Sequence, residues 1–204
     1  MTSPTLVIGS HNAKKGRELA ELVAPYGLTA KTLADFPDAP EPVEDGDTFE
    51  ANARIKATEQ ARALGQWVIA DDSGICVDAL GGEPGIYSAR FAAMADAGEG
   101  DEANNTLLLS KLDGLPPAKR GAHYVAVVAL ADPTGEVRAE TRGECHGRIT
   151  TERRGANGFG YDPLFELREY HRTFGELGPE VKRALSHRSR AMRQMLPRLV
   201  ALLK

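Results

Sequence analysis

Residues 122–131, AHYVAVVALA, give the strongest strand signal in the chain. This segment constrains the fold of the chain more than any other. A membrane-spanning helix needs about 18 or more consecutive apolar residues, so this segment is too short for one. The DPTG turn that follows predicts that residues 136–149 return antiparallel to it. The chain is therefore expected to contain a long β-hairpin, which could project as a lobe of its own.

The first half of the sequence alternates strand and helix patterns. Residues 5–10 predict a short buried strand, and apolar residues at helical spacing predict a helix after it. Ser10 or Asn12 can cap this helix, while Pro25 and Gly27 end it. Further expected elements are a strand at 28–33, an exposed loop at 37–47, a helix from Thr48 to Leu64 ended by Gly65, a strand at 67–72 and a helix at 101–112.

The second half adds a glycine-rich loop at 153–163 and two helices. Pro179 suits a helix start, and Ser186 can cap a last helix with one apolar face. Pro197 within that helix predicts a kink or an early break. Strand–helix alternation followed by a hairpin predicts an α/β fold, with a mixed central sheet flanked by helices.

Length and charge narrow the function further. A chain of 204 residues suits one domain, 1–204, which could have two lobes. A net charge of −4 argues against a nucleic-acid partner, because duplex-binding domains are usually strongly basic. It leaves room for a small anionic ligand held in a local basic pocket. The absence of a leader-like or membrane-spanning apolar segment predicts a cytoplasmic protein with no membrane partner. The two cysteines, Cys76 and Cys145, have no metal-ligand spacing.

The segment SHNAKK lies where the first strand meets the first helix. Backbone N–H groups at a helix start bind anions, and Lys14 and Lys15 add positive charge. Ser10 and Asn12 could donate hydrogen bonds to phosphate oxygens. The alternative is an ordinary capped helix with solvated lysines, because no Walker A sequence is present.

The segment ADDSG places two consecutive carboxylates at the end of an apolar strand. In a strand, Asp71 and Asp72 point to opposite faces, so only one can reach a cleft and the other needs a separate partner. Carboxylates at this edge of a sheet, together with substrate phosphates, suit Mg²⁺. The alternative is a turn in which Asp and Ser bond the backbone.

Lys56 lies in the alanine-rich segment expected to form a helix. Phe49, Asn52 and Gln60 share its face at turn spacing. A solvated lysine is the alternative to a functional one.

The segment GFGYDPLF alternates aromatic residues with glycines in a loop. Phe159 and Tyr161 could stack on a flat base, and Asp162 could accept hydrogen bonds from the edge of that base. The alternative is a loop anchored by two aromatic side chains.

The segment SHRS begins the expected last helix, with Lys182 nearby. His187 and Arg188 could reach a base or a phosphate. A capped helix with surface charges is the alternative. The other histidines have no metal spacing, and no nucleophile motif such as GxSxG is present.

In this order the five segments resemble the Ham1/RdgB family of inosine triphosphate pyrophosphatases. The resemblance runs from residue 5 to residue 191, and the segments that carry it are SHNAKK, DGDTFEANARIKA, ADDSGICVDALGGEPGIYSAR, GFGYDPLF and SHRSRA. The resemblance implies hydrolysis of ITP, dITP and XTP to the monophosphate and pyrophosphate. It also implies Mg²⁺ as cofactor, a homodimer, and an elongated α/β fold with a cleft between two lobes.

The resemblance assigns roles segment by segment. Asp72 would be the catalytic carboxylate and a Mg²⁺ ligand, Lys56 matches a family lysine, and Ser73 would touch substrate. The residues assigned to the triphosphate are Ser10, His11, Asn12, Ala13, Lys14 and Lys15. Those assigned to the base are Phe159, Gly160, Tyr161, Asp162, Lys182, His187 and Arg188.

One position departs from the family pattern. The family usually has a metal-binding glutamate three residues before a glycine, and here Val43 stands at that spacing before Gly46. Glu44 or Glu41 could substitute, and Glu44 is the expected second metal ligand.

Two other function classes fit the same residues less fully. One is a Maf-like pyrophosphatase acting on modified nucleotides. The other is a nucleotide-binding module without catalysis, against which the acidic net charge and the ADDSG carboxylates argue.

Overall fold

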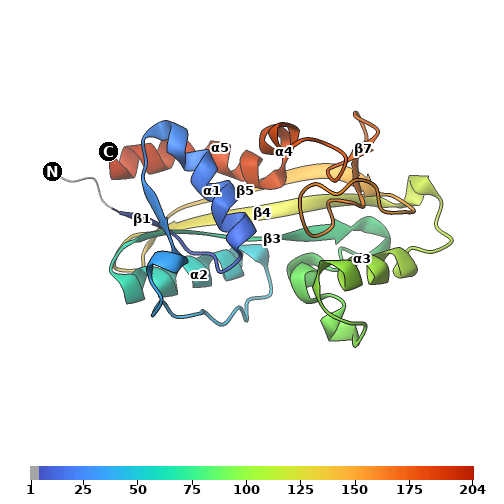
Figure 1. Ribbon diagram of the computed structural model, residues 1–204. Helices are drawn as coiled ribbons and strands as arrows, with labels where there is room; N and C mark the ends of the chain where they lie inside the picture. Colours follow the sequence, from blue (N-terminus) through green and yellow to red (C-terminus); the bar gives the residue numbers. More distant parts are fainter. Residues whose placement is uncertain (1–4) are drawn as a thin grey trace. The chain divides into compact units, whose positions relative to one another are not determined.

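The computed structural model describes residues 5–204, which form a seven-stranded sheet flanked by helices (Figure 1). The sheet order is β2-β1-β3-β4-β5-β6-β7. The strands are β1 (Leu6–Ile8), β2 (Ala30–Thr32), β3 (Trp67–Val77), β4 (Gly121–Ala131), β5 (Val137–Ile149), β6 (Phe165–Leu167) and β7 (Arg172–Thr173). The helices are α1 (Ala13–Val23), α2 (Phe49–Leu64), α3 (Gly100–Lys111), α4 (Pro179–Leu185) and α5 (His187–Leu203).

The sheet is mixed, as the sequence predicts. β1 pairs in parallel with both β2 and β3, whereas β6 pairs antiparallel with β5 and β7. β4 and β5 form the expected hairpin, in which the N–H of Asp132 donates to the carbonyl of Glu136. The α/β fold with a mixed central sheet is thus confirmed. The short strands β6 and β7 have no clear sequence pattern and were not predicted.

The chain divides into two compact units. The described part of the first unit comprises residues 5–72, 126–143 and 188–204, and the second comprises residues 73–125 and 144–187. The boundaries fall inside β3, β4 and β5 and between His187 and Arg188. Two of them therefore divide the ADDSG and SHRS segments.

In the first unit, α1 and α5 pack on one face of the strands. Leu19 of α1 and Met192 and Met195 of α5 are buried in one cluster with Ile8 and Ile69. This packing follows from the apolar stripe of each helix. α5 continues through Pro197 to Leu203, so the early break did not occur.

α2, also in the first unit, has the bounds that the sequence predicts. The Thr48 hydroxyl accepts a hydrogen bond from the N–H of Ala51, which caps the helix. Gly65 ends it with φ of 62°, a left-handed conformation that glycine adopts without strain. The segment before it, 37–47, is the expected loop.

β3 differs from its prediction. It does not end at Asp72 but continues to Val77, so the two aspartates lie in its middle. β1 ends at Ile8, and the N–H of Gly9 donates to the carbonyl of Ile69. The aspartates therefore follow the carboxyl end of the parallel β1–β3 pairing, where open α/β sheets place ligand-binding side chains.

The second unit has a separate core rich in aromatic side chains. Phe165 lies 4.7 Å from Tyr124 and 5.5 Å from Phe174 between ring centroids. Leu108 of α3 and Leu164 are fully buried in the same cluster. Residues 153–163 form no regular helix or strand, as expected. No helix within residues 5–204 is long and apolar enough to cross a membrane.

Candidate functional site

The start of α1 is capped by Asn12 rather than by Ser10. Asn12 Oδ1 accepts hydrogen bonds from the backbone N–H groups of Lys14 at 3.0 Å and Lys15 at 3.2 Å. His11, Asn12, Ala13 and Lys14 are exposed. This end of the helix therefore presents its positive dipole, together with a lysine, to solvent.

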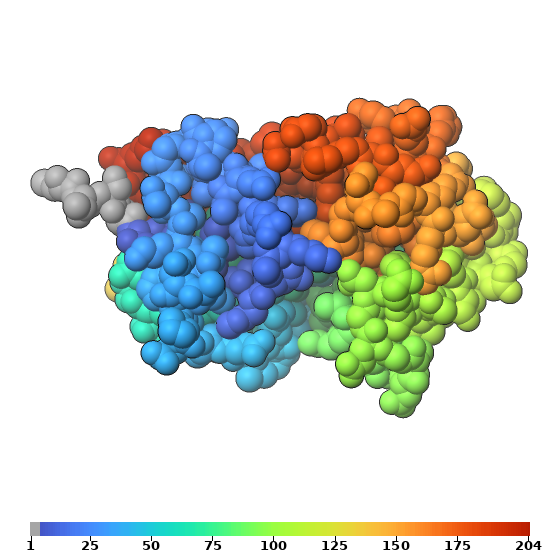
Figure 2. Space-filling model, in the orientation of Figure 1, coloured from blue at the N-terminus to red at the C-terminus, as the bar shows by residue number. Residues whose placement is uncertain are grey.

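A cavity of about 580 Å³ lies beside this helix start, within the first unit. In Figure 2 the N-terminal segment, in blue shades, covers much of the visible face of this unit. Predicted phosphate-binding residues in its wall are Ser10, His11 and Ala13. The rest of the wall is formed by Gly16, Arg17, Ala20, Thr32, Leu33, Ala34, Phe36, Pro37 and Ala39.

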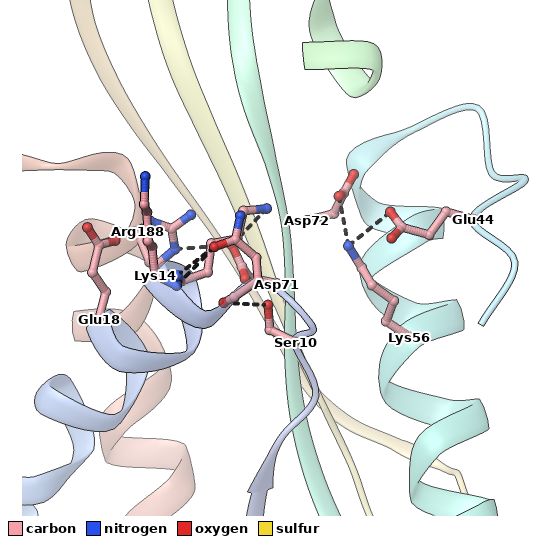
Figure 3. A network of polar contacts seen from close by, with 10 residues as sticks. Ser10, Lys14, Glu18, Glu44, Lys56, Asp71, Asp72 and Arg188 are labelled. Atoms are coloured by element: carbon pink, nitrogen blue, oxygen red, sulfur yellow. Dashed lines mark hydrogen bonds and ion pairs between the residues drawn. The ribbon is translucent and has the colours of Figure 1, made fainter. Parts of the chain in front are cut away.

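Asp71 and Asp72 point to opposite sides of β3, as the strand geometry predicts (Figure 3). Asp71 is buried on the side of α1 and α5. Its Oδ2 accepts a hydrogen bond from Nε of Arg188 at 3.1 Å and lies 3.9 Å from Nζ of Lys15. Arg188 also donates to Glu18 of α1. Asp71 thus ties the two helices to the strand by ionic contacts.

The charges around Asp71 shift its titration and that of its partners. Burial alone would raise the pKa of Asp71, but Lys15 and Arg188 hold it well below its usual value. Burial lowers the pKa of Lys15, although Asp71 opposes this. Asp71 is therefore a structural anion in this arrangement, ionised at neutral pH.

Asp72 faces α2 and the loop 37–47 (Figure 3). Its Oδ1 accepts a hydrogen bond from Nζ of Lys56 at 2.8 Å, and the same Nζ lies 3.1 Å from Oε2 of Glu44. One ammonium therefore joins two carboxylates from the strand and the loop. The sequence analysis singles out Lys56 and Asp72 in separate segments, and the structure shows that they are hydrogen-bonded to each other.

Titration in this second cluster is governed by burial and by the shared charge. Burial raises the pKa of Asp72, and Lys56 only partly opposes it. Burial would lower the pKa of Lys56, but Asp72, Asp71 and Glu44 together raise it. Asp72 thus has a higher proton affinity than an ordinary aspartate, which suits a group that must accept or orient a proton.

The same cluster offers oxygen ligands to a divalent cation. Within residues 5–204, Asp72 Oδ2 is buried and has no hydrogen-bond partner. Carboxylate oxygens are the ligands that Mg²⁺ prefers, usually one or two with substrate phosphates. No group of three or more His, Cys, Asp or Glu side chains suited to a metal occurs in this range. The residues fit a cation that completes its shell with substrate and water.

In the second unit, Asp162 is the centre of a buried polar cluster. Its Oδ2 accepts hydrogen bonds from the N–H of Phe159 at 2.8 Å and from Nζ of Lys182 at 2.7 Å. The Lys182 ammonium lies 4.1 Å from the centroid of the Phe159 ring, a cation–π contact. The structure therefore brings together three residues that the family resemblance assigns to the base.

Tyr124 of β4 contacts two of the predicted base-binding residues. Its ring stacks on His187 with 4.6 Å between centroids and 9° between planes. Its hydroxyl donates to Asp162 Oδ1 at 3.4 Å. Sequence reasoning missed this residue, because within an apolar strand a tyrosine reads only as core.

Tyr161 and Gly160 of this loop both contact other parts of the second unit. The Tyr161 ring is buried, and its hydroxyl donates to the carbonyl of Ser88 at 2.8 Å. Gly160 is held at both its backbone groups by Asp101 and Asn105 of α3. Phe159, which is only partly buried, is the aromatic ring of this loop that remains accessible.

Two further predicted site residues, Arg188 and Ser73, lie in different units. Arg188 lies in the first unit and contacts Asp71 and Glu18, whereas the resemblance assigns it to the base. Ser73 is partly buried on β3 directly after Asp72. The contact of Arg188 with Asp71 could not be foreseen, because the two are 117 residues apart in the sequence.

Comparison with known proteins gives one consistent family. A model of the Ham1 family matches residues 6–198. The dITP/XTP pyrophosphatase of Rhodopirellula baltica is 52% identical over 199 residues, covering 98% of this chain and 94% of that protein. The protein of the same name from Lactiplantibacillus plantarum is 48% identical, with coverage of 96% and 95%.

Solved structures agree with the sequence comparison. The Staphylococcus aureus Ham1 protein superimposes with a TM-score of 0.83 at 37% identity, covering 97% of this chain and 99% of that one. The nucleoside-triphosphatase, or dITP/XTP pyrophosphatase, of Mycobacterium abscessus has a TM-score of 0.75 at 41% identity, with coverage of 96% and 99%.

Proposed function

The chain belongs to the Ham1 family, and we propose that it hydrolyses ITP, dITP and XTP to the nucleoside monophosphate and pyrophosphate. The observation that carries this proposal is the cluster of Asp72, Lys56 and Glu44 beside a capped helix start with two lysines. Such an arrangement supplies a carboxylate that can orient a water molecule, and positive charge that can bind phosphate groups. The Maf-like and purely binding alternatives are not favoured by the family membership.

The start of α1 would bind the triphosphate. Its N–H groups and its dipole attract anions, and Lys14 and Lys15 add positive charge. Ser10 adds a hydroxyl in the wall of the neighbouring cavity. The tail of the substrate carries several negative charges, so this concentration of donors favours the nucleoside triphosphate over the monophosphate product.

Pyrophosphate as the leaving group means that water attacks the α-phosphorus. An oxygen–phosphorus bond to water forms while the bond to the β-phosphate oxygen breaks, and the electron pair leaves with pyrophosphate. Asp72 would orient this water and accept its proton, for which burial raises its pKa. Lys56 holds Asp72 in place and adds positive charge where negative charge accumulates.

Mg²⁺ is proposed as the cofactor, held by Asp72 and Glu44. When bound, it would neutralise charge on the phosphate oxygens. Support comes from the buried Asp72 Oδ2, which has no hydrogen-bond partner within residues 5–204, and from the nearness of Glu44 to the same lysine. The loop around Glu44 thus provides a carboxylate where Val43 occupies the usual family position.

The second unit would recognise the base. Hypoxanthine and xanthine carry a carbonyl at C6, where adenine carries an amino donor. Lys182 and His187 can donate to such an oxygen, and the accessible Phe159 ring can stack on the base. Guanine shares the carbonyl, so its rejection must occur at the 2-amino group. Buried polar groups left unpaired by the wrong base can discriminate by about 10⁴-fold.

Turnover of four nucleotides tests the proposal. ITP and XTP should be hydrolysed with kcat/KM far above that for GTP and ATP. A modified UTP in the same assay separates this activity from that of a Maf-like enzyme. Equal rates on ITP and ATP, or preference for the modified UTP, would refute the proposed specificity.

A homodimer and a cytoplasmic location complete the proposal. The homodimer rests on the family resemblance, whereas the cytoplasmic location suits a substrate that belongs to the nucleotide pool. Sedimentation of the purified protein gives the oligomeric state directly.

A further inference from the structure

Two side chains of α3 form hydrogen bonds to one residue, Gly160, in the loop of the proposed base site. Asp101 Oδ2 accepts a hydrogen bond from the N–H of Gly160 at 2.8 Å, and Nδ2 of Asn105 donates to the carbonyl of the same glycine at 3.0 Å. Asp101 and Asn105 are four residues apart, so they lie on one face of the helix. Both polar groups of the Gly160 backbone are thus fixed by one helix.

Gly160 lies between the residues that form the polar cluster. Phe159 precedes it and donates its N–H to Asp162 Oδ2, which also accepts from Lys182. Gly160 itself has φ of 61°, a conformation that needs external contacts to be held in one place because glycine is otherwise flexible. Fixing this peptide therefore fixes the direction of the Phe159 ring relative to Lys182.

The position of Asn105 is not explained by the stability of α3 alone. Its side chain is 1% exposed, and its Oδ1 has no hydrogen-bond partner within residues 5–204. A buried acceptor without a partner costs free energy, and an apolar residue would fill the same place without that cost. Its amide group is instead directed at the loop, where Nδ2 donates to the carbonyl of Gly160.

We propose that Asp101 and Asn105 are positioning residues that set base selectivity by holding Gly160, an inference that rests on the proposed function. Neither residue needs to touch the substrate. They would act through the loop, by keeping Phe159 and Asp162 at the spacing that the base requires. Displacement of such groups by about 1 Å can cost about 10²-fold in rate.

The neighbouring asparagine provides a matched control. Asn104 is equally buried, and it also bonds backbone groups, but these are the N–H of Ala92 and the carbonyl of Ala89. Asn104→Ala loses two hydrogen bonds and Asn105→Ala loses one, so Asn104→Ala should lower the melting temperature at least as much. Of these two variants, only Asn105→Ala removes a hydrogen bond to Gly160.

The test measures kcat and KM for ITP and ATP with Asn105→Ala, Asn104→Ala and the wild type. We expect Asn105→Ala to lower the ITP-to-ATP ratio of kcat/KM by about 10-fold or more, mainly through KM for ITP. Asn104→Ala should keep the ratio of the wild type. Equal changes of the ratio in both variants, or no change in Asn105→Ala, would overturn the inference.

Two further measurements keep the inference separate from the proposed function. Asp101→Ala lies at an exposed helix start and should fold, lose selectivity, and be largely rescued by Asp101→Asn, which retains an acceptor for the Gly160 N–H. Binding of IMP and AMP needs no turnover. If the wild type bound IMP but hydrolysed no ITP, the proposed function would fail, and the IMP-to-AMP affinity ratio of the variants would still decide the inference.

Discussion

At the scale of single residues, Asp71 and Asp72 are neighbours with different surroundings. Asp71 is enclosed by Arg188 and Lys15, which keep it ionised, whereas Asp72 retains an oxygen without a hydrogen-bond partner within residues 5–204. Lys56 holds the other oxygen of Asp72. The alternation of a β-strand alone separates a structural carboxylate from a chemical one.

Asp72→Asn should lower kcat for ITP by several orders of magnitude, because the amide cannot accept a proton from water. Glu44 remains as a partner for Lys56, so the protein should stay folded. Pyrophosphate release and circular dichroism measure the two effects. Near-normal turnover in a folded variant would remove Asp72 from the chemistry.

Glu44→Gln should raise the Mg²⁺ concentration needed for half-maximal activity, because one of two proposed ligands loses its charge. Glu41→Gln in the same loop is the matched control and should leave this concentration unchanged. Titration of activity with MgCl₂ distinguishes the two glutamates. If Glu41→Gln had the larger effect, Glu41 and not Glu44 would be the ligand.

Asp71→Asn should lower the free energy of unfolding at pH 7 by about 3 kcal/mol, because it leaves Arg188 and Lys15 without a buried anion. The pKa of Asp71 is lower in the folded chain than its value of about 3.9 in an unfolded one, so its ionised form stabilises the fold above that pH. The difference between variant and wild type should shrink as the pH falls below about 4.

Thermal unfolding between pH 3 and pH 7 measures this difference, with Asp38→Asn in the exposed loop as control. A difference that stayed constant over this range would mean that the stabilisation by Asp71 is not ionic.

At the scale of elements, the sequence predicts best where the determinants are local. α2 begins and ends as predicted because Thr48 and Gly65 act on their own neighbouring backbone. The sequence predicts that β3 ends at Asp72, because two consecutive carboxylates close an apolar run. In the structure the strand continues, and both aspartates are buried beside partners from α1, α2 and α5. Such partners come from distant parts of the chain, so no local pattern reveals them.

The same limit applies to the candidate site. Residue type and segment point to four of its residues, Lys56, Asp72, Asp162 and Lys182. The hydrogen bonds of Lys56 to Asp72 and of Lys182 to Asp162 cannot be predicted in this way. Tyr161 shows the limit most clearly. The loop sequence allows its ring to stack on a base, but the ring is buried in the core of the second unit, whose other residues come mostly from distant segments.

Variants of Asn12 separate the helix cap from phosphate binding. Asn12→Ala removes the acceptor for two N–H groups of α1 and should destabilise the protein by about 1 kcal/mol. Asn12→Asp keeps an acceptor but adds negative charge, so it should retain stability and raise KM for ITP. Melting temperature and KM measure the two effects. A normal KM in the folded Asn12→Asp variant would argue against triphosphate binding at this helix start.

At the scale of the whole molecule, the net charge of −4 conceals an uneven distribution. Lysines and an arginine gather around the start of α1 and β3, where they meet the buried aspartates. A small polyanion can thus be bound by a protein that is acidic overall. The Ham1 family match spans residues 6–198, so it includes the residues around Asp71 and Asp72 and those around Asp162.

The products formed from ITP in the presence of Mg²⁺ decide whether this chain is a pyrophosphatase. Phosphorus NMR or a coupled assay distinguishes pyrophosphate from orthophosphate. One IMP and one pyrophosphate should form for each ITP consumed, and EDTA should abolish the reaction. Release of orthophosphate with IDP, or no hydrolysis of ITP at all, would contradict the proposed activity.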